Sequence, residues 1–550
     1  MTAPGAGASH GYGRGEVAAA VALMGVGLAV ALILGLLGDG VYQDDDIAHF
    51  LFARDAWDNT ESMLHWWARP GYNLPTMLAA PFGLDACRAL SALQTAGVAL
   101  LAWLIARRVG VGRWWSLAAT LFVWAQPLVM TLAETTLTET PAALYLTLGT
   151  WLYLRGNRVW GAVAVSPAFV TRLETLALAP VFVAALAWDA WRAADGRLGP
   201  ALRRYWLWGS AACLLWAPAA YCLAAWLVDL PAASSPLYIF LRGHSAAYGR
   251  GAWHHYAVRW AQASSVGIAA LALAGAVRLG RRAALVTALA LGLVVLQGMI
   301  FSFGLFASGG YARFLVPVGG LVAVLAAGGI RCLWRGESRL ATSTALVAAP
   351  VMVVLVGYLH PGAVARSAAQ AHALSWCVAT VCAVLLVLAL VTASTRRYAA
   401  PLSGVLLLML AAAQVGAQVR PLWMDNNVDG MHRAVLHSVD QLRRKGLSER
   451  RALTQHVLIC YLHDNAKKVG GHEALRRWRA APPGTLFYWD SKYCATPGSP
   501  AAQSALYAAL QRGGRLVAQA SCAGCHVEVY ARTGDAPPGE RASASTVSPN

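Results

Sequence analysis

Long apolar stretches alternate with short arginine-rich loops as far as about residue 420 of the chain. About 20 consecutive apolar residues form a helix that crosses the roughly 30 Å hydrocarbon core of a bilayer. The pattern predicts thirteen spans, of which Val159–Val170 and Leu176–Trp188 form either one tilted span or two spans that break at Thr171-Arg172-Leu173-Glu174. The other predicted spans are Val17–Leu37, Arg88–Ala106, Ser116–Leu132, Pro141–Leu154, Tyr205–Val228, Ala261–Val277, Ala283–Phe303, Phe314–Leu333, Thr342–Tyr358, Leu374–Ala393 and Leu402–Val419.

From Pro421 onward, the long apolar stretches give way to short amphipathic segments. Helical periodicity and short β-rich runs alternate there, which predicts a small α/β domain over residues 421–532. The Pro-, Ser- and Ala-rich residues 533–550 are expected to be disordered. The predicted helices are His432–Arg444, Glu473–Arg479 and Ala501–Gln511, and the predicted strands are Val457–Tyr461, Thr485–Trp489, Arg515–Ala518 and His526–Ala531.

Composition supports a membrane protein. Hydrophobic residues make up 58 % of the 550 residues and charged residues 13 %, whereas an average soluble domain carries about 25 % charged residues. A disordered chain, a coiled coil and an ordinary soluble enzyme are therefore excluded. The predicted fold is an all-α polytopic bundle of about 13 transmembrane helices over residues 1–420, with a small C-terminal α/β domain outside the cytoplasm.

The formal net charge of +18 comes mainly from arginines in the loops between spans. These loops alternate onto one face, which the positive-inside rule assigns to the cytoplasm. The N-terminus is then cytoplasmic and the C-terminal domain extracytoplasmic, in the cell inner (plasma) membrane. The sequence lacks a dense basic stripe with interleaved aromatic residues, so a nucleic-acid partner is not expected. The first apolar run is interpreted as an uncleaved helix rather than a signal peptide.

The first external loop, residues 41–84, carries three adjacent carboxylates, Asp44, Asp45 and Asp46. Adjacent acids repel one another. At a membrane surface they can bind a metal, act as a general base or capture a sugar. Alternatively, they form the solvated first turn of a helix, where acids are favoured. Aromatic and charged residues follow them, which predicts an amphipathic helix in the interface.

A set of short motifs then occurs in order along the chain. Together they resemble the GT-C superfamily of polytopic glycosyltransferases, which includes the protein O-mannosyltransferases (glycosyltransferase family 39) and the lipid A aminoarabinose transferases. The resemblance runs from about Val17 to Pro317. The segments that carry it are Asp45-Asp46 with Ala53-Arg54, Arg69-Pro70-Gly71-Tyr72-Asn73-Leu74, Ala106-Arg107-Arg108-Val109-Gly110, Leu137-Thr138-Glu139-Thr140-Pro141-Ala142, Thr171-Arg172-Leu173-Glu174 and Tyr311-Ala312-Arg313-Phe314-Leu315-Val316-Pro317.

The resemblance implies a sugar donor on a polyprenyl phosphate and an acceptor on a lipid, glycan or protein. A first-loop carboxylate acts as general base on the acceptor hydroxyl, which attacks the anomeric carbon with inversion. Asp45 matches the motif and is the first candidate, followed by Asp46 and then Asp44.

The remaining motif residues are implied to bind substrate. Arg313 and Arg172 are expected to pair with the donor phosphate, since guanidinium binds phosphate bidentately. Glu139 is expected to hold the acceptor or, with Asp45, a divalent cation such as Mg²⁺ or Mn²⁺. Asp44, Arg69 and Tyr311 complete the predicted substrate-binding set.

Each of these residues also has a structural interpretation. Arg313 at a span end can extend to the lipid headgroups. Glu139 before Pro141 fits a helix N-terminus. Arg172 and Glu174 can pair with each other where the chain breaks.

Two further patterns are weaker signals. Cys522-Ala523-Gly524-Cys525-His526 matches the haem-attachment motif C-x-x-C-H, but it lies between two predicted strands, so a hairpin turn is favoured over haem. A disulfide among Cys460, Cys494, Cys522 and Cys525 fits an oxidising compartment better. His244 and Trp253-His254-His255-Tyr256 fit an aromatic interfacial loop better than a metal site.

The predicted function is therefore a membrane glycosyltransferase. The alternative is a transporter or flippase for a lipid-linked substrate, which requires ionisable or broken-helix features near the bilayer midplane. The prominent acids lie instead at the external ends of spans, which favours chemistry at the interface. A non-catalytic scaffold is a third alternative.

Overall fold

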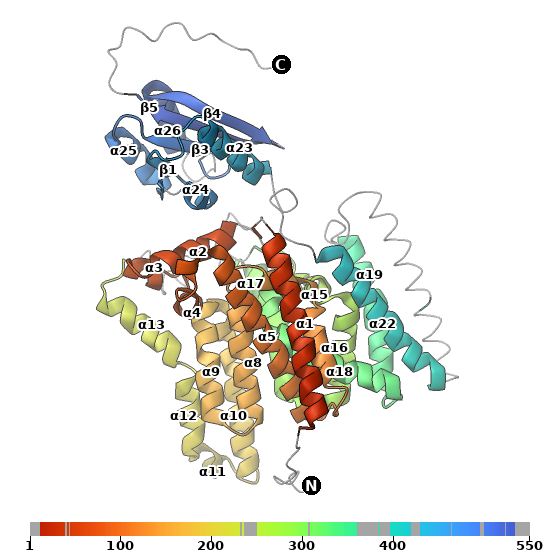
Figure 1. The fold of residues 1–550 in the computed structure, drawn as a ribbon. Coiled ribbons are helices and arrows are strands. Elements are labelled where there is room, and N and C mark those ends of the chain that lie inside the picture. The colour runs from red at the N-terminus through yellow and green to blue at the C-terminus, as the bar shows by residue number, and fades with distance from the viewer. Residues whose placement is uncertain are drawn as a thin grey trace. The chain divides into compact units, whose positions relative to one another are not determined.

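The computed structural model describes residues 12–533, apart from residues 39–40, 43, 232–233, 236–249, 306–308, 360–383, 385–395, 420–429, 464, 495–499 and 523. The chain divides into two units. The bundle unit comprises Met1–Leu37 and Phe52–Pro421, and the C-terminal unit comprises Gly38–Leu51 and Leu422–Asn550. The first-loop segment Gly38–Leu51 thus groups with the distant C-terminal part of the chain. Figure 1 labels the helices and strands of both units.

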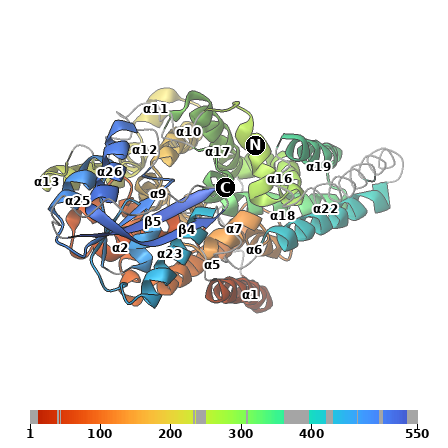
Figure 2. The same ribbon diagram turned by 90° about the horizontal axis from the view of Figure 1, so that it is seen from above.

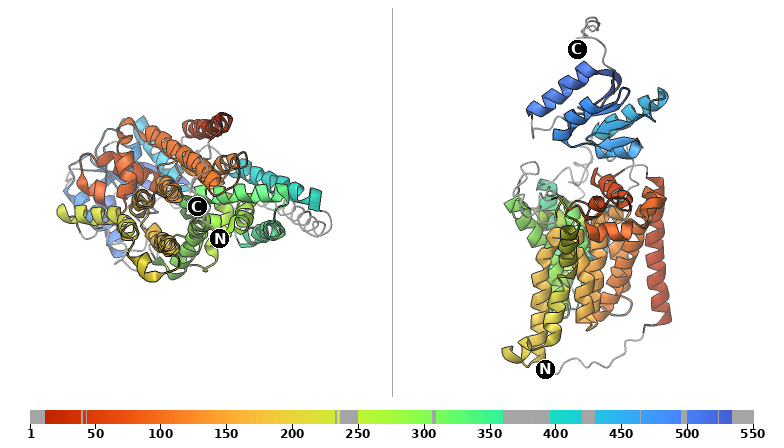
Figure 3. Two further views of the ribbon diagram at one scale, coloured as in Figure 1. Left: turned by 90° about the horizontal axis from the view of Figure 1, so that it is seen from below. Right: turned by 90° about the vertical axis from the view of Figure 1, so that its left-hand side faces the viewer.

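Helices build the bundle unit and run side by side along much of their length (Figure 3). Short helices occupy the first loop, where α2 (Asp44–Asp55) confirms a helix but not the expected amphipathic character, because its apolar and polar residues do not separate onto two faces. The other helices of the first loop are α3 (Thr60–Leu64), α4 (Pro70–Thr76) and η1 (Ala80–Phe82). The longer bundle helices are α1 (Arg14–Leu37), α5 (Leu84–Arg108), α8 (Glu139–Leu154), α9 (Arg158–Thr171), α10 (Ala179–Ala193), α16 (Val266–Leu279), α17 (Ala284–Phe303), α18 (Gly319–Arg335), α19 (Arg339–Leu359) and α22 (Arg396–Gln418).

Five helical segments in the described part of the chain are long and apolar enough to cross a membrane, namely Arg14–Leu37, Leu84–Arg108, Leu173–Ala193, Val266–Phe303 and Ala312–Arg335. A sixth is the pair α12 (Tyr205–Cys213) and α13 (Trp216–Leu227), which is bent by 47°. The chain is therefore a multi-pass membrane protein, but the predicted count of thirteen spans is not confirmed. The predicted span Leu374–Ala393 falls almost entirely outside the described residues.

Several predicted spans are broken. The stretch from Val159 to Trp188 forms two helices joined by η2 (Leu173–Leu178), with the break at Arg172. The predicted span Ser116–Leu132 is divided into α6 (Leu117–Trp124) and α7 (Pro127–Ala133). Proline lacks the N–H that continues a helix, which explains a new helix beginning at Pro127.

Small residues allow close packing inside the bundle. A side-chain carbon on Gly275 of α16 would lie 1.8 Å from the carbonyl oxygen of Leu325 in α18, and one on Gly329 of α18 would lie 1.9 Å from the carbonyl oxygen of Leu271 in α16. The two backbones therefore meet where neither helix has a side chain, as is typical of membrane helix pairs.

The C-terminal unit contains a five-stranded sheet with strand order β2-β1-β3-β5-β4. The first three strands in that order are parallel, and β5 runs antiparallel to β3 and β4. Helix α23 packs along β4 and β5 (Figure 2). The elements are α23 (Gly430–Arg444), β1 (Ala452–Thr454), α24 (Val457–Leu462), β2 (Ala466–Lys468), α25 (Gly471–Ala480), β3 (Leu486–Asp490), α26 (Pro500–Gly513), β4 (Gly514–Cys522) and β5 (Cys525–Arg532).

The three helices and three of the four strands predicted here are confirmed. The predicted strand Val457–Tyr461 is wrong, because this apolar segment forms helix α24. The His456 side chain accepts the Leu458 N–H at 3.3 Å and so caps the helix start. Strands β1 and β2, of three residues each, were not predicted. The tail from residue 534 lies outside the described residues.

Candidate functional site

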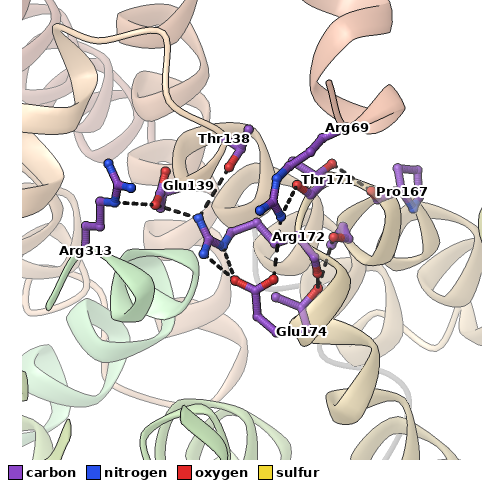
Figure 4. Close-up of polar contacts among 10 residues, drawn as sticks. Arg69, Thr138, Glu139, Pro167, Thr171, Arg172, Glu174 and Arg313 are labelled. Carbon is purple, nitrogen blue, oxygen red and sulfur yellow. Dashed lines mark hydrogen bonds and ion pairs between the residues drawn. The ribbon is translucent and has the colours of Figure 1, made fainter. Parts of the chain in front are cut away.

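Helix ends in the bundle unit bring five charged side chains together, here called the arginine–glutamate cluster (Figure 4). Four of them come from motif residues that were predicted to bind substrate, and the fifth is Glu174. The cluster consists of Arg69, Glu139, Arg172, Glu174 and Arg313.

Arg172 lies at the centre of the cluster. Its Nη1 donates to Glu139 Oε1 at 2.5 Å, and its Nε donates to Glu174 Oε1 at 2.7 Å. Arg313 Nε lies 3.3 Å from the same Glu139 oxygen, and Arg69 Nη1 lies 3.6 Å from Glu174 Oε2. Each carboxylate is thus shared by two guanidinium groups.

The cluster is shielded from solvent. The side chains of Arg172 and Arg313 are each 4 % exposed, and that of Glu139 is 1 % exposed. Buried charges are stable only when they are paired and hydrogen-bonded. The Phe314 ring lies 4.3 Å from the Arg172 guanidinium carbon, and the Tyr311 ring lies 5.1 Å from that of Arg313, so both cations also contact aromatic faces.

Irregular backbone positions the arginines. Arg69 precedes α4 with φ of 59°, a left-handed conformation that is uncommon for residues other than glycine, and Pro70 then begins the helix. Arg172 is extended between α9 and η2. The hydroxyl of Thr175 donates to the Ala168 and Arg172 carbonyls at 3.0 and 2.7 Å, which satisfies backbone groups at this break.

The structural interpretations from the sequence have different outcomes. The Arg172–Glu174 pair is confirmed, but both residues belong to a larger network. Glu139 begins α8, as expected for an acid at a helix N-terminus. Arg313 does not extend to the surface, because its side chain is buried against Glu139. Oxygen Oε2 of Glu139 is buried and accepts no hydrogen bond from any described residue.

A second group of polar side chains lies in the C-terminal unit and is called the Asp44 cluster: Asp44, His432, Lys492 and Tyr493. His432 Nε2 and Asp44 Oδ1 are 2.6 Å apart. Lys492 Nζ donates to Asp44 Oδ2 at 2.6 Å, and the Tyr493 hydroxyl donates to the same oxygen. The three partners of Asp44 were not predicted from the sequence.

Electrostatics favour the ionised form of Asp44. Burial alone raises the pKa of Asp44, but the hydrogen bond from His432 and the nearby ammonium group of Lys492 outweigh it, so the pKa lies well below its usual range. Burial and the neighbouring Asp44 charge raise the pKa of Tyr493, which keeps its hydroxyl a donor.

The three first-loop carboxylates differ in their surroundings. Asp44 is engaged by the Asp44 cluster. Asp46 is fully buried and accepts the Tyr42 backbone N–H at 3.2 Å. Asp45 is only partly buried. The expected solvated first turn is therefore wrong for Asp44 and Asp46.

The Asp44 cluster also has the spacing of a metal site, since Asp44, His432 and His456 each place one ligand-type atom within 4.8 Å of the others. Its chemistry does not fit a cation. Lys492 donates to the same carboxylate, and His456 Nδ1 accepts a backbone N–H, which places the proton of the neutral ring on Nε2. A metal-binding imidazole presents a lone pair instead. Asp45 and Glu139, the predicted ligands of a divalent cation, belong to different units.

The weaker sequence patterns are placed as follows. Cys522 and Cys525 face each other across the β4–β5 hairpin, which confirms the predicted turn, and Gly524 in that turn has φ of 79°. The structure contains no disulfide among the four cysteines of the predicted set. His526 forms hydrogen bonds with Ser521 and Glu528. His255 Nε2 lies 2.9 Å from the Gly310 carbonyl oxygen, and His244 lies outside the described residues.

Comparisons with known proteins identify the fold. No protein-family model and no curated protein sequence matches the chain. Its structure is similar to that of ArnT from Cupriavidus metallidurans bound to undecaprenyl phosphate, with a TM-score of 0.56 and 16 % identity over 94 % of this chain and 98 % of that one. The apo structure of the same protein matches with a TM-score of 0.56 and 17 % identity over 93 % and 98 %. The GT-C-like fold expected from the motifs is thereby confirmed.

Proposed function

We propose that the chain is a membrane glycosyltransferase that moves a sugar from a polyprenyl-phosphate donor to an acceptor hydroxyl on the extracytoplasmic side. The observation that carries this proposal is the convergence of Arg69, Arg172 and Arg313 on two buried carboxylates at helix ends. The fold shared with ArnT, one structure of which is bound to undecaprenyl phosphate, supports the same lipid carrier.

The three arginines bind the donor phosphate. Guanidinium groups recognise phosphate bidentately and keep their charge at any physiological pH. The cluster holds three cations against two anions, so a phosphate placed there is attracted. As the glycosidic bond breaks, negative charge develops on the leaving phosphate, and fixed guanidinium groups stabilise it. Tyr311, stacked on Arg313, completes this subsite.

Asp45 is the general base. It matches the first-loop motif and is partly buried, whereas Asp46 is fully buried. The Asp45 carboxylate takes the proton of the acceptor hydroxyl while the hydroxyl oxygen attacks the anomeric carbon. The bond from that carbon to the phosphate oxygen breaks, and polyprenyl phosphate leaves, with inversion at the sugar.

Glu139 orients the acceptor through Oε2, which accepts no hydrogen bond from any described residue. The two guanidinium groups on Oε1, like the ammonium group on Asp44, do not fit a divalent cation. The C-terminal domain, residues 421–532, shapes the acceptor side in the extracytoplasmic space. The donor is a membrane lipid, and the acceptor is a lipid, glycan or protein of the cell envelope. The N-terminus is cytoplasmic.

The test is transfer or slow hydrolysis of synthetic polyprenyl-phosphate sugars by the purified full-length protein. Wild type should consume at least one donor of a broad panel, and Asp45→Asn should lower the rate by about 10²–10⁴-fold, the usual contribution of a general base. Asp55→Asn is the matched control, because Asp55 ends the same helix with its side chain half exposed. Activity retained in Asp45→Asn but lost in Asp46→Asn transfers the base to Asp46. If no donor is consumed, the proposal fails, and flipping of lipid-linked sugars in liposomes tests the transporter alternative.

A further inference from the structure

Asp44 stands directly before the proposed base at the start of α2. Its carboxylate is bonded to side chains that follow 388 to 449 residues later in the chain, namely His432, Lys492 and Tyr493. Both oxygens are used: Oδ1 faces His432, and Oδ2 accepts from Lys492 and Tyr493. An acid in the first turn ordinarily interacts with its own helix, but this one joins the helix to another part of the C-terminal unit.

These bonds are of the strong kind. Hydrogen bonds that involve an ionised group are shorter and about twice as strong as neutral ones. The Asp44 side chain is 11 % exposed and that of His432 is 5 % exposed, so water competes little for either. The rings of His432 and His456 have centroids 5.9 Å apart, and each places a nitrogen within 4.8 Å of an Asp44 oxygen.

Neighbouring contacts hold the same turn of helix. Asp46 accepts the Tyr42 N–H, Ile47 is fully buried, and the Phe50 ring packs edge-on against Tyr461 at 5.9 Å. All of these residues belong to the C-terminal unit. The backbone on both sides of Asp45 is therefore fixed to this unit, with Asp44 as the charged attachment.

We propose that Asp44 is a positioning residue that sets the orientation of the Asp45 carboxylate, in place of the substrate contact predicted for it. This inference rests on the proposed function, in which Asp45 is the base. A general base acts within hydrogen-bond reach of its proton, and a misplacement of about 1 Å can lower a rate about 10²-fold. Asp44 is covalently adjacent to Asp45, so any change in its attachment rotates the first turn of α2.

The kinetic test separates positioning from donor binding. Asp44→Asn retains the size of the side chain but loses its charge. It should lower kcat by about 10- to 100-fold and leave KM for the lipid donor within about twofold, because donor binding is assigned to the arginine–glutamate cluster. Lys492→Met should give a smaller loss of the same kind, and Lys467→Met, at an exposed lysine of the same unit, should give none.

A double variant shows whether Asp44 acts through Asp45. In the Asp45→Asn background the base is already absent, so Asp44→Asn should leave the residual rate unchanged. If the two losses multiply instead, Asp44 acts independently of Asp45 and the positioning role is overturned. An increase in KM with an unchanged kcat overturns it as well and restores the substrate contact.

Hydrogen–deuterium exchange of the full-length protein tests the attachment without any substrate. Amides of residues 44–51 should exchange at least about tenfold faster in Asp44→Asn than in wild type, and amides of α5 should not change. Faster exchange with an unchanged kcat overturns the positioning role while the proposed function stands. A wild type that consumes no donor overturns the proposed function, and with it this role, whatever the exchange rates show.

Discussion

The arginine–glutamate cluster and the Asp44 cluster both keep charge away from water, but they balance it in different ways. The first consists of three guanidinium groups and two carboxylates, in which each carboxylate is shared by two guanidinium groups. The second surrounds one carboxylate with an imidazole, an ammonium and a phenol. The first therefore depends on its central member, Arg172, which contacts both carboxylates, whereas Asp44 keeps two of its three donors when any one of them is lost.

Burial makes this difference measurable. Removing one partner of a buried ion pair leaves an uncompensated charge and costs far more than the pair itself contributes. Replacing one of several donors to a carboxylate removes a single hydrogen bond. The following substitutions test the comparison, beginning with the largest expected effect.

Arg172→Met should destabilise the bundle unit by about 3–5 kcal/mol, because both buried carboxylates lose their shortest contact. Glu139 then keeps only Arg313 at 3.3 Å, and Glu174 keeps only Arg69 at 3.6 Å. Thermal unfolding in detergent measures the loss. Arg158→Met is the matched control in the same unit, since Arg158 pairs with Asp189 at 3.0 Å but both side chains are about one-third exposed. That change should cost about 1 kcal/mol or less. Equal effects of the two substitutions would mean that burial does not distinguish the cluster.

Gly71→Ala should destabilise the bundle by about 2 kcal/mol through the backbone that supports Arg69. An added carbon would lie 2.2 Å from Thr171 Oγ1 and 2.6 Å from the Pro167 carbonyl oxygen, and a backbone oxygen cannot rotate away. Helix α4 then separates from α9, and Arg69 loses its 3.4 Å contact with the Thr171 carbonyl. Gly35→Ala in α1 is the control, because nothing lies within 4 Å of its added carbon. An unfolding midpoint equal to that of wild type in Gly71→Ala would contradict the close packing of these helices.

The ordered sequence motifs predict four of the five residues in the arginine–glutamate cluster. They do so through their resemblance to a known family, whereas the local signals for caps and breaks indicate only a structural role for the same residues. They do not predict that Arg172 joins Glu139 to Glu174, since Glu139 and Arg172 are more than 30 residues apart and only tertiary packing sets their distance.

The C-terminal unit is less predictable. Its amphipathic helix α23 follows from periodicity alone, whereas β1 and β2 are too short to show an alternation. The segment of α24 is a continuous apolar run, which periodicity does not separate from a buried strand. No local pattern links Asp44 with Lys492 or Tyr493, because nearly the whole bundle lies between them in the chain.

Tyr493→Phe should destabilise the C-terminal unit by about 1.5 kcal/mol, the lower end for a hydrogen bond to a charged group. Asp44 keeps His432 and Lys492 as partners, so its charge remains compensated. Thermal unfolding of the full-length protein gives the value, and Tyr205→Phe, at a highly exposed tyrosine, gives the baseline. A loss of unfolding free energy as large as that of Arg172→Met would show that the Asp44 cluster also depends on a single member.

Asp490→Asn should have the smallest effect, and one that depends on pH. Burial raises the pKa of Asp490 above its ordinary value of 3.8, although the N–H groups of Tyr493 and Lys492 oppose the shift. Between the unfolded and the raised folded pKa, the folded chain binds more protons than the unfolded chain, so stability falls as pH rises through that window and then levels off.

Asparagine still accepts both N–H groups but does not ionise. The unfolding temperature of the variant should therefore match wild type at the acid end of the window and exceed it above the window. A difference that is flat with pH would mean that Asp490 ionises normally when folded. That part of the C-terminal unit would then be as insensitive to pH as the guanidinium groups of the bundle.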